Sequence, residues 1–126
     1  MVKLDHVTIP VRDWKRSRDW YVRNLGFEPE FEVEAGGREA LGVAAVKDGA
    51  DLTVFLEQRS GPIQSGQAVY TIQVDDVDAL HGRLAAEGVA FSTAPSKQYW
   101  GYGAELHDPD GHVLYLWDEQ SMASKG

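Results

Sequence analysis

Residues 68–88, AVYTIQVDDVDALHGRLAAEG, hold the pattern that decides the fold, because they join a strand to a helix through a short acidic turn. The first seven residues alternate between two faces, with the period of two that is typical of a strand. Asp75 or Asp76 can cap the helix that follows, and Gly88 can end it. The segment therefore predicts a strand followed by an amphipathic helix.

The same pattern occurs near the start of the chain, in residues 4–26, LDHVTIPVRDWKRSRDWYVRNLG. Asp13 is the expected helix cap there, and Gly26 is the expected helix end. Turn residues then divide the rest of each half into three strand candidates. The dividing turns are Gly36-Gly37 and Asp48-Gly49 in the first half and DPDG in the second, and the strand candidates are 27–34, 39–47, 51–58, 89–94, 103–107 and 112–118.

The two halves align with only two one-residue deletions. Val11 lies over Val74 at an offset of 63, and residues 51–57 lie over residues 112–118 at an offset of 61. An internal repeat of about 60 residues predicts two copies of one folding unit. We therefore expect an α+β fold of two tandem βαβββ units that form a curved, cup-shaped mixed sheet with the helices outside. The single domain 1–126 would divide into a first unit of about 1–58, a linker 59–67, a second unit of about 68–120 and a tail 121–126.

Three segments carry a resemblance to a known family: LDHVTIPVRDWKRSRDWYVRNLGFEP, VYTIQVDDVDALHGRLAAEGV and HDPDGHVLYLWD. They resemble the vicinal-oxygen-chelate superfamily of glyoxalases, bleomycin resistance proteins and extradiol dioxygenases, over essentially the whole chain. The resemblance implies a pocket for a small organic molecule and a homodimer. In many members it also implies a divalent metal ion, held by residues of the first and last strands of each half.

His6 matches the first metal ligand of that family. The resemblance and the internal alignment together assign the other three places to Val54, Val69 and Tyr115. Valine has no donor atom, and a neutral phenol is a poor ligand near pH 7. Strand alternation predicts that Glu57 points away from the cup. We therefore expect no cofactor, with a divalent metal held by His6, Glu57 and water as the alternative.

The remaining cup residues are mostly apolar or aromatic, which suits an organic ligand better than a bare ion. The stretch QYWGYG at 98–103 adds aromatic side chains that we expect at the edge of the pocket, or at a dimer interface. The predicted ligand-binding residues are His6, Thr8, Val54, Val69, Thr71, Gln73, Trp100, Tyr102, Tyr115 and Trp117.

The charge of the chain excludes some partners. Twenty acidic and 12 basic residues give a net charge of −8, which repels nucleic acid and anionic lipid. No apolar run approaches the roughly 20 residues that span a bilayer, and the sequence MVKLDHVTIP lacks the apolar core of a signal peptide. There is no cysteine to form a disulfide or to ligate a metal. We expect a cytoplasmic protein that binds neither nucleic acid nor membrane.

Four glutamates, at positions 28, 30, 32 and 34, alternate along one predicted strand. Placed on one face, they would attract a cationic ligand. The favoured interpretation is a solvated edge of the sheet, where charge prevents aggregation.

Three functions remain open from the sequence. The leading hypothesis is a protein that binds an aromatic or cationic organic compound without the usual metal. The alternative is a divergent metal-dependent lyase, isomerase or dioxygenase that uses His6 as its base. The third is an interaction module whose cup is filled by its own side chains.

Overall fold

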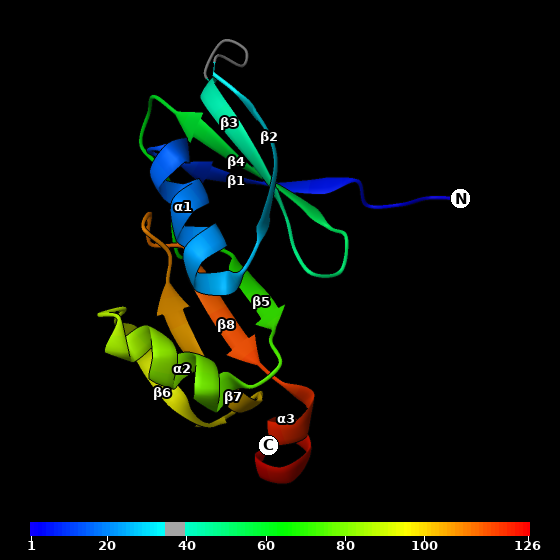
Figure 1. Cartoon of the computed structure of the whole chain (residues 1–126), viewed down its shortest axis with the longest axis vertical. Coiled ribbons are helices and arrows are strands. Elements are labelled where there is room, and N and C mark those ends of the chain that lie inside the picture. Colours follow the sequence, from blue (N-terminus) through cyan, green and yellow to red (C-terminus); the bar gives the residue numbers. More distant parts are fainter. Residues whose placement is uncertain (35–39) are drawn as a thin grey trace. The chain divides into compact units, whose positions relative to one another are not determined.

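The structure, a computed structural model, describes residues 1–34 and 40–126, with only the backbone described at residues 40 and 41 (Figure 1). It divides into two compact units, Met1–Gln64 and Ser65–Gly126. The predicted turn at Gly36-Gly37 lies outside the described residues. In chain order the elements are β1 (His6–Val11), α1 (Trp14–Leu25), β2 (Glu28–Val33), β3 (Ala40–Lys47), β4 (Thr53–Arg59), β5 (Val69–Gln73), α2 (Val77–Ala86), β6 (Phe91–Gln98), β7 (Gly101–His107), β8 (Val113–Trp117) and α3 (Glu119–Lys125).

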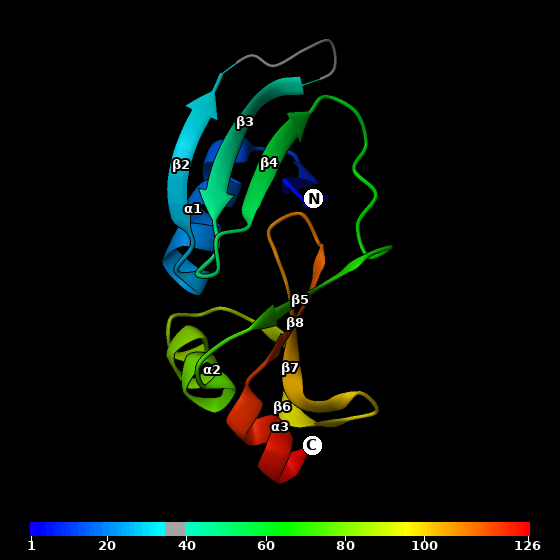
Figure 2. The same cartoon turned by 90° about the vertical axis from the view of Figure 1, so that its right-hand side faces the viewer.

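Each unit contains the order βαβββ, with α3 added at the end of the second, which confirms the predicted α+β fold. The first sheet has the strand order β1-β4-β3-β2, and the second has the order β5-β8-β7-β6. In both sheets the first strand pairs in parallel with the last strand of its unit, and the other neighbours are antiparallel, as Figure 2 shows for β2, β3 and β4. Both sheets are therefore mixed, and the last strand of each unit has a neighbour on both sides.

The first helix, α1, begins and ends as predicted. The Asp13 carboxylate accepts hydrogen bonds from the backbone N–H groups of Lys15 and Arg16, at 3.0 and 3.2 Å. Gly26 ends the helix in the left-handed conformation, with φ of 71°, which glycine adopts without steric cost. Trp14 and Tyr21 are buried on the side of α1 that covers the sheet.

The second helix, α2, is capped by Asp76 rather than Asp75, since the Asp76 carboxylate accepts a hydrogen bond from the N–H of Ala79 at 3.0 Å. A second carboxylate also reaches this end. Asp118, which follows β8, accepts from the N–H of Val77 at 2.7 Å and from the N–H of Ser121 at 2.7 Å. Burial alone would raise the pKa of Asp118, but these hydrogen bonds favour the ionised form and lower it below its usual value. One side chain thus stabilises the starts of two helices.

The last of those helices, α3, replaces the tail that was expected over 121–126. Asp118 is its N-cap, and Met122 packs against β7, where its sulfur accepts the backbone N–H of Tyr102 at 3.4 Å. The helix α3 was not predicted from the sequence because it is only seven residues long. So short a helix lacks the repeated apolar stripe by which helices are recognised.

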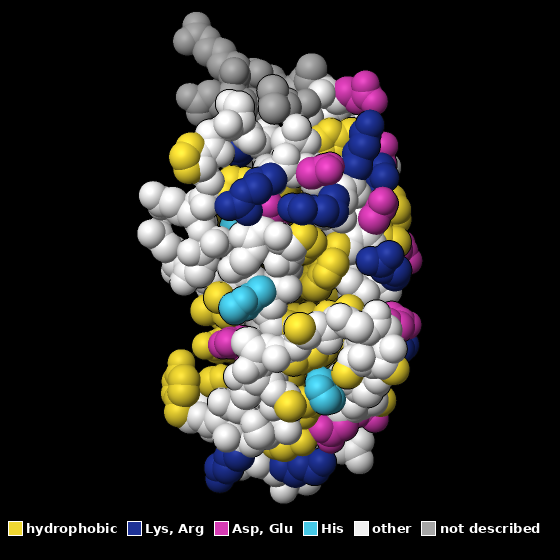
Figure 3. Space-filling model, turned by 90° about the vertical axis from the view of Figure 1, so that its left-hand side faces the viewer, with side chains coloured by type: hydrophobic (Ala, Val, Ile, Leu, Met, Phe, Trp, Pro, Cys, Tyr) yellow, Lys and Arg dark blue, Asp and Glu magenta, His cyan; other side chains and the backbone are white. Residues whose placement is uncertain are grey.

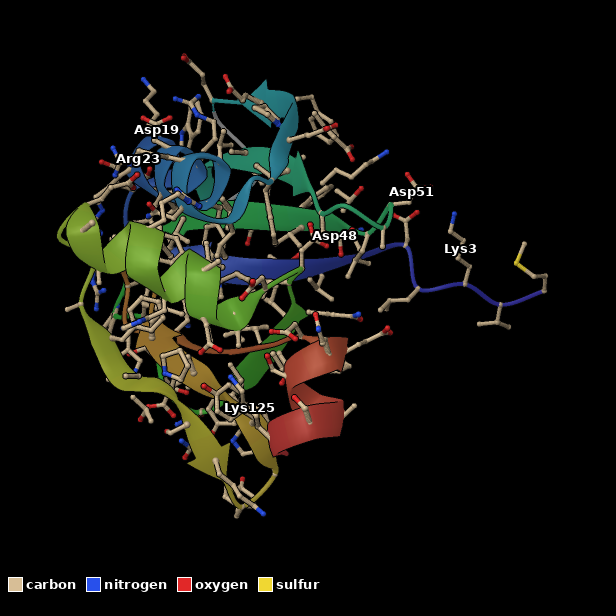
Figure 4. The ribbon with its side chains drawn as sticks, turned by 60° about the horizontal axis from the view of Figure 1, so that its bottom comes forward. Lys3, Asp19, Arg23, Asp48, Asp51 and Lys125 are labelled. Atoms are coloured by element: carbon tan, nitrogen blue, oxygen red, sulfur yellow. The ribbon has the colours of Figure 1, made fainter. Side chains whose placement is uncertain are left out.

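The hairpins β3–β4 and β7–β8 have the same turn. In the first, Asp48 Oδ1 accepts from the N–H groups of Ala50 and Leu52, at 2.8 and 2.9 Å (Asp48 is labelled in Figure 4). In the second, Asp108 Oδ1 accepts from the N–H groups two and four residues further on, both at 2.9 Å. The turns therefore correspond at an offset of 60 residues.

The helices α1 and α2 each cover one face of their own sheet and enclose that unit's core. The core side chains are fully or nearly fully buried, and they alternate along the strands with side chains on the opposite face. Figure 3 shows Lys and Arg side chains interspersed with acidic ones on the surface of the first unit. We call the sheet face that the helix does not cover the free face. Core residues include Ile9, Val11, Val54 and Leu56 in the first unit and Val77, Leu84, Leu106, Leu114 and Leu116 in the second.

Candidate functional site on the free faces of the two sheets

The free face of the second sheet carries a stacked aromatic pair. The rings of Trp100 and Tyr115 lie parallel, with centroids 5.2 Å apart and an interplanar angle of 9°. Tyr115 belongs to β8, whereas Trp100 lies in the two-residue turn between β6 and β7. The indole can fold down onto the sheet because Gly103 beneath it has no side chain, and a Cβ there would collide with the ring. We call Trp100 and Tyr115 the aromatic pair.

A third aromatic residue, Tyr99, lies beside this pair and is 94% exposed. Partial burial raises the pKa of the Tyr115 phenol, and the neighbouring Tyr99 and Glu105 raise it further. The Tyr115 hydroxyl is therefore neutral at pH 7 and can donate a hydrogen bond. The pair combines flat apolar surface with a polar group, as sites for organic ligands do.

The pairing of β5 with β8 places the predicted residues of the second unit. Thr71 lies opposite Tyr115, and Val69 and Gln73 lie opposite residues 113 and 117. Since cross-strand partners share a face, Val69, Thr71, Gln73, Tyr115 and Trp117 all occupy the free face. The structure therefore brings these five together with Trp100 in one unit.

Tyr102 lies elsewhere. Its hydroxyl donates to Asp78 Oδ1 of α2 at 2.8 Å, which places the ring on the helix side of the sheet. Lys125 of α3, labelled in Figure 4, donates to Asp78 Oδ2 at 3.0 Å. The hydrogen bond from Tyr102 and the nearby ammonium lower the pKa of Asp78. Tyr102 thus connects β7 to two helices instead of lining the predicted pocket.

The free face of the first sheet carries a different set of rings. His6 stacks on Phe55, with centroids 4.0 Å apart and an interplanar angle of 20°, and Phe31 meets Phe55 edge-on at 5.7 Å. The Nδ1 atom of His6 lies 2.9 Å from Oδ2 of Asp5. Thr8 is the partner of Phe55 in the parallel pairing, so it shares this face. Sequence reasoning missed both phenylalanines.

The predicted register of β4 was wrong by one residue. His6, Thr8 and Pro10 lie opposite Thr53, Phe55 and Glu57, so these six residues share the free face. A slip of one residue exchanges the two faces of a strand. Val54, predicted to line the cup, is therefore a core residue that is 6% exposed.

The same slip misplaced Glu57. The carboxylate lies on the free face with His6, not away from it, and forms an ion pair with Arg59. The counterpart of Tyr115 in the first unit is Phe55, at an offset of 60, because each is the partner of the threonine two residues into its unit's first strand.

The glutamates of β2 do not share one face either. An irregularity in the pairing between Pro29 and Phe31 turns Glu30 toward the free face, where its carboxylate accepts from Thr53 Oγ1 at 3.0 Å. Glu32 points to the helix side and forms an ion pair with Arg18 of α1 at 2.5 Å. A β-bulge of this kind redirects the side chains around it. The strand therefore presents no continuous acidic face.

The residues at the family's metal-ligand positions do not fit a divalent ion. With the observed register they are His6, Phe55, Val69 and Tyr115, of which only His6 is a good ligand. Glu57 cannot join His6, because it lies opposite Pro10, four residues or about 13 Å further along the strand, and metal ligand bonds are only about 2.0–2.2 Å long. Among the described residues, no three His, Cys, Asp or Glu side chains gather closely enough to hold a metal ion.

A separate hollow lies at the start of α1, away from the rings of the free faces. It is open and mostly polar, and it contains none of the predicted ligand-binding residues. Its lining residues are Arg12, Asp13, Trp14, Lys15, Glu34 and Gln58.

Two consecutive βαβββ units, each with a mixed four-stranded sheet and a helix on one face, are the architecture of a known protein superfamily. The model of the Glyoxalase/Bleomycin resistance protein/Dioxygenase superfamily matches residues 3–116. The chain belongs to this superfamily, as the sequence resemblance predicted. No curated protein matches the chain. In the described part of the chain, no helix is long and apolar enough to cross a membrane.

Solved structures of the superfamily superpose on most of the chain. A member from Sphaerobacter thermophilus is 27% identical, covers 94% of this chain and 98% of its own, and has a TM-score of 0.76. The antibiotic-binding protein TnmS3 from Streptomyces sp. CB03234 is 28% identical, with coverage of 93% and 96% and a TM-score of 0.75. A glyoxalase/bleomycin resistance protein from the same Streptomyces is 30% identical, with coverage of 90% and 98% and a TM-score of 0.70.

Proposed function

We propose that this protein binds an aromatic organic compound on the free face of its second sheet, without a divalent metal. The observation that carries the proposal is the stacking of Trp100 on Tyr115. Both rings are only partly buried, so each offers flat surface to a planar ligand. Thr71 and Gln73 supply polar groups beside them on the same face.

The chemistry of the residues at the metal-ligand positions supports a metal-free mode of binding. Phe55 and Val69 offer no donor atoms, and the phenol of Tyr115 is kept neutral by its raised pKa. A ligand on this face is therefore held by stacking and hydrogen bonds instead of by coordination of its oxygens to an ion. The description of TnmS3 as an antibiotic-binding protein is consistent with binding of this kind.

A titration of the whole chain with planar aromatic compounds tests the proposal. We expect Trp100→Ala to weaken the binding of such compounds by about tenfold, because stacking contributes on the order of 1 kcal/mol beyond area burial. Trp20→Phe, on α1 of the first unit, is the matched control and should leave binding unchanged. Binding no tighter than millimolar for every compound, measured by calorimetry, would contradict the proposal.

A second candidate function is catalysis with His6 as general base. It is favoured by the contact between Asp5 and His6, since a carboxylate bound to one ring nitrogen fixes the orientation of the imidazole ring. Turnover of a hemithioacetal or a catechol that is lost in His6→Ala would favour it. Turnover that persists in His6→Ala would exclude His6 as the base.

The homodimer and the cytoplasmic location stay predictions.

A further inference from the structure

Glu105 lies next to the aromatic pair on the free face of the second sheet. It is the antiparallel partner of Tyr115, so the two side chains point to the same side of the sheet. The Glu105 side chain is 29% exposed, which leaves its carboxylate within reach of a ligand on that face. Its negative charge also contributes to the raised pKa of Tyr115.

The contacts of the Glu105 carboxylate include a hydroxyl and a histidine but no permanently charged cation of the described residues. Ser92 Oγ donates to Oε2 at 2.7 Å, and His107 Nε2 lies 4.0 Å from the same oxygen. Among the described residues, no Lys or Arg forms an ion pair with Glu105. A partly buried carboxylate of this kind attracts a cation more strongly than a fully solvated one, since less water screens it.

The three basic side chains of the second unit are all placed elsewhere. Arg83 lies 3.6 Å from Glu87, and Lys125 is paired with Asp78 at 3.0 Å. Lys97 is exposed and lies opposite Tyr102, whose ring is on the helix side of the sheet. The free face around the aromatic pair therefore has a carboxylate and no fixed positive charge.

We propose that Glu105 makes this face selective for planar aromatic compounds that carry a positive charge, an inference that rests on the proposed binding function. The ring system stacks on the aromatic pair, and the cationic group lies against the Glu105 carboxylate. A charge-assisted contact of this type is stronger than a neutral hydrogen bond. The faces of Trp100 and Tyr115 add a cation–π attraction for the same charge.

Three acridine compounds with one ring system and different charge test the inference. They are 9-aminoacridine, which is cationic at pH 7, acridone, which is neutral, and acridine-9-carboxylate, which is anionic. Each is titrated by fluorescence into the full chain and into Glu105→Gln, which keeps an acceptor for Ser92 and removes the charge. Glu119→Gln, at the exposed start of α3, is the matched control for the loss of one charge.

We expect 9-aminoacridine to bind most tightly and acridine-9-carboxylate most weakly. Glu105→Gln should weaken the binding of 9-aminoacridine by about tenfold, leave acridone within twofold, and improve the binding of acridine-9-carboxylate. Glu119→Gln should change none of the three. Raising the salt concentration should weaken 9-aminoacridine binding in the native protein more than in Glu105→Gln.

Two failures have separate meanings. If all three compounds bind with equal affinity, are unaffected by Glu105→Gln and lose affinity in Trp100→Ala, the inference about Glu105 is overturned and the binding function stands. If none of the compounds binds, or Trp100→Ala changes nothing, both the function and the inference are overturned.

Discussion

The two units have the same topology and the same local devices, but their free faces differ. In the first unit, Phe55 is stacked by His6, and in the second its counterpart Tyr115 is stacked by Trp100. The helix sides are alike, since Leu56 and its counterpart Leu116 are both fully buried. The two halves are therefore alike in the residues that fold each unit and differ in the residues on the free face. This contrast supports the proposal that the function lies on the free faces.

The largest effect on stability should come from substitutions in the buried cores, which the two units have in common. Leu56→Ala and Leu116→Ala each remove a fully buried side chain and should lower the free energy of unfolding by about 3 kcal/mol. Urea denaturation followed by circular dichroism measures this. Equal losses would show that the two cores contribute alike. A loss under 1 kcal/mol in either variant would contradict its place in a well-packed core.

A smaller effect should come from the side chains that hold the helix starts. Gln58 accepts from the N–H of Trp14 at 3.1 Å, at the first residue of α1, and Asp118 does the same for Val77 of α2. Gln58→Ala should cost about 1 kcal/mol, and Asp118→Ala about 2 kcal/mol because a carboxylate is the stronger acceptor.

The pH dependence sharpens that comparison. The pKa of Asp118 is lowered in the folded protein, so its contribution is present above the usual carboxyl pKa of about 4 and is lost as the pH falls through the folded value. The stability difference between the native protein and Asp118→Ala should therefore shrink as the pH falls below about 4. The difference for Gln58→Ala should stay constant, because an amide does not titrate in this range. A constant difference for Asp118→Ala from pH 7 to pH 2 would contradict the assignment.

Substitutions on the two free faces should differ in their effect on ligand binding. Tyr115→Ala should weaken the binding of a planar aromatic ligand by about tenfold, whereas Phe55→Ala should change it by less than twofold. Isothermal titration calorimetry measures both constants. An equal loss in the two variants would mean that the first sheet takes part in the same binding event.

The smallest effect is expected from metal. Protein purified without chelators and without a His-tag should hold less than about a tenth of an equivalent of metal, because no three His, Cys, Asp or Glu side chains of the described residues gather closely enough to hold an ion. Incubation with nickel, zinc, manganese or iron(II) should not raise this value in elemental mass spectrometry. About one equivalent that is lost in His6→Ala would overturn the metal-free proposal.

Strands, helices and their caps followed from the sequence because each has a local chemical signal. Asp13, Asp76 and Gly26 act through residues within one turn of themselves, so their roles are visible in a short stretch of chain. The sequence also allowed Trp100 and Tyr115 to be placed at the same pocket, because both residues belong to one repeat unit.

The register of β4 was harder to predict, because Leu52, Val54, Phe55 and Leu56 are all apolar and alternation cannot assign their faces. The hairpin turns contain the missing signal. Aligning Asp48 with Asp108 gives the offset of 60 and places Phe55 over Tyr115. The side of Tyr102 could not be found this way, since it depends on a hydrogen bond to Asp78 in another element.

The resting position of Trp100 has a thermodynamic consequence for any ligand of this face. The indole already covers Tyr115, so part of the stacking enthalpy is gained before a ligand arrives. A ring system that stacks on the pair therefore meets an indole that is already held in place, and binding needs little further ordering of Trp100. Preorganisation of this kind lowers the entropic cost of binding, so a rigid planar compound benefits from it most.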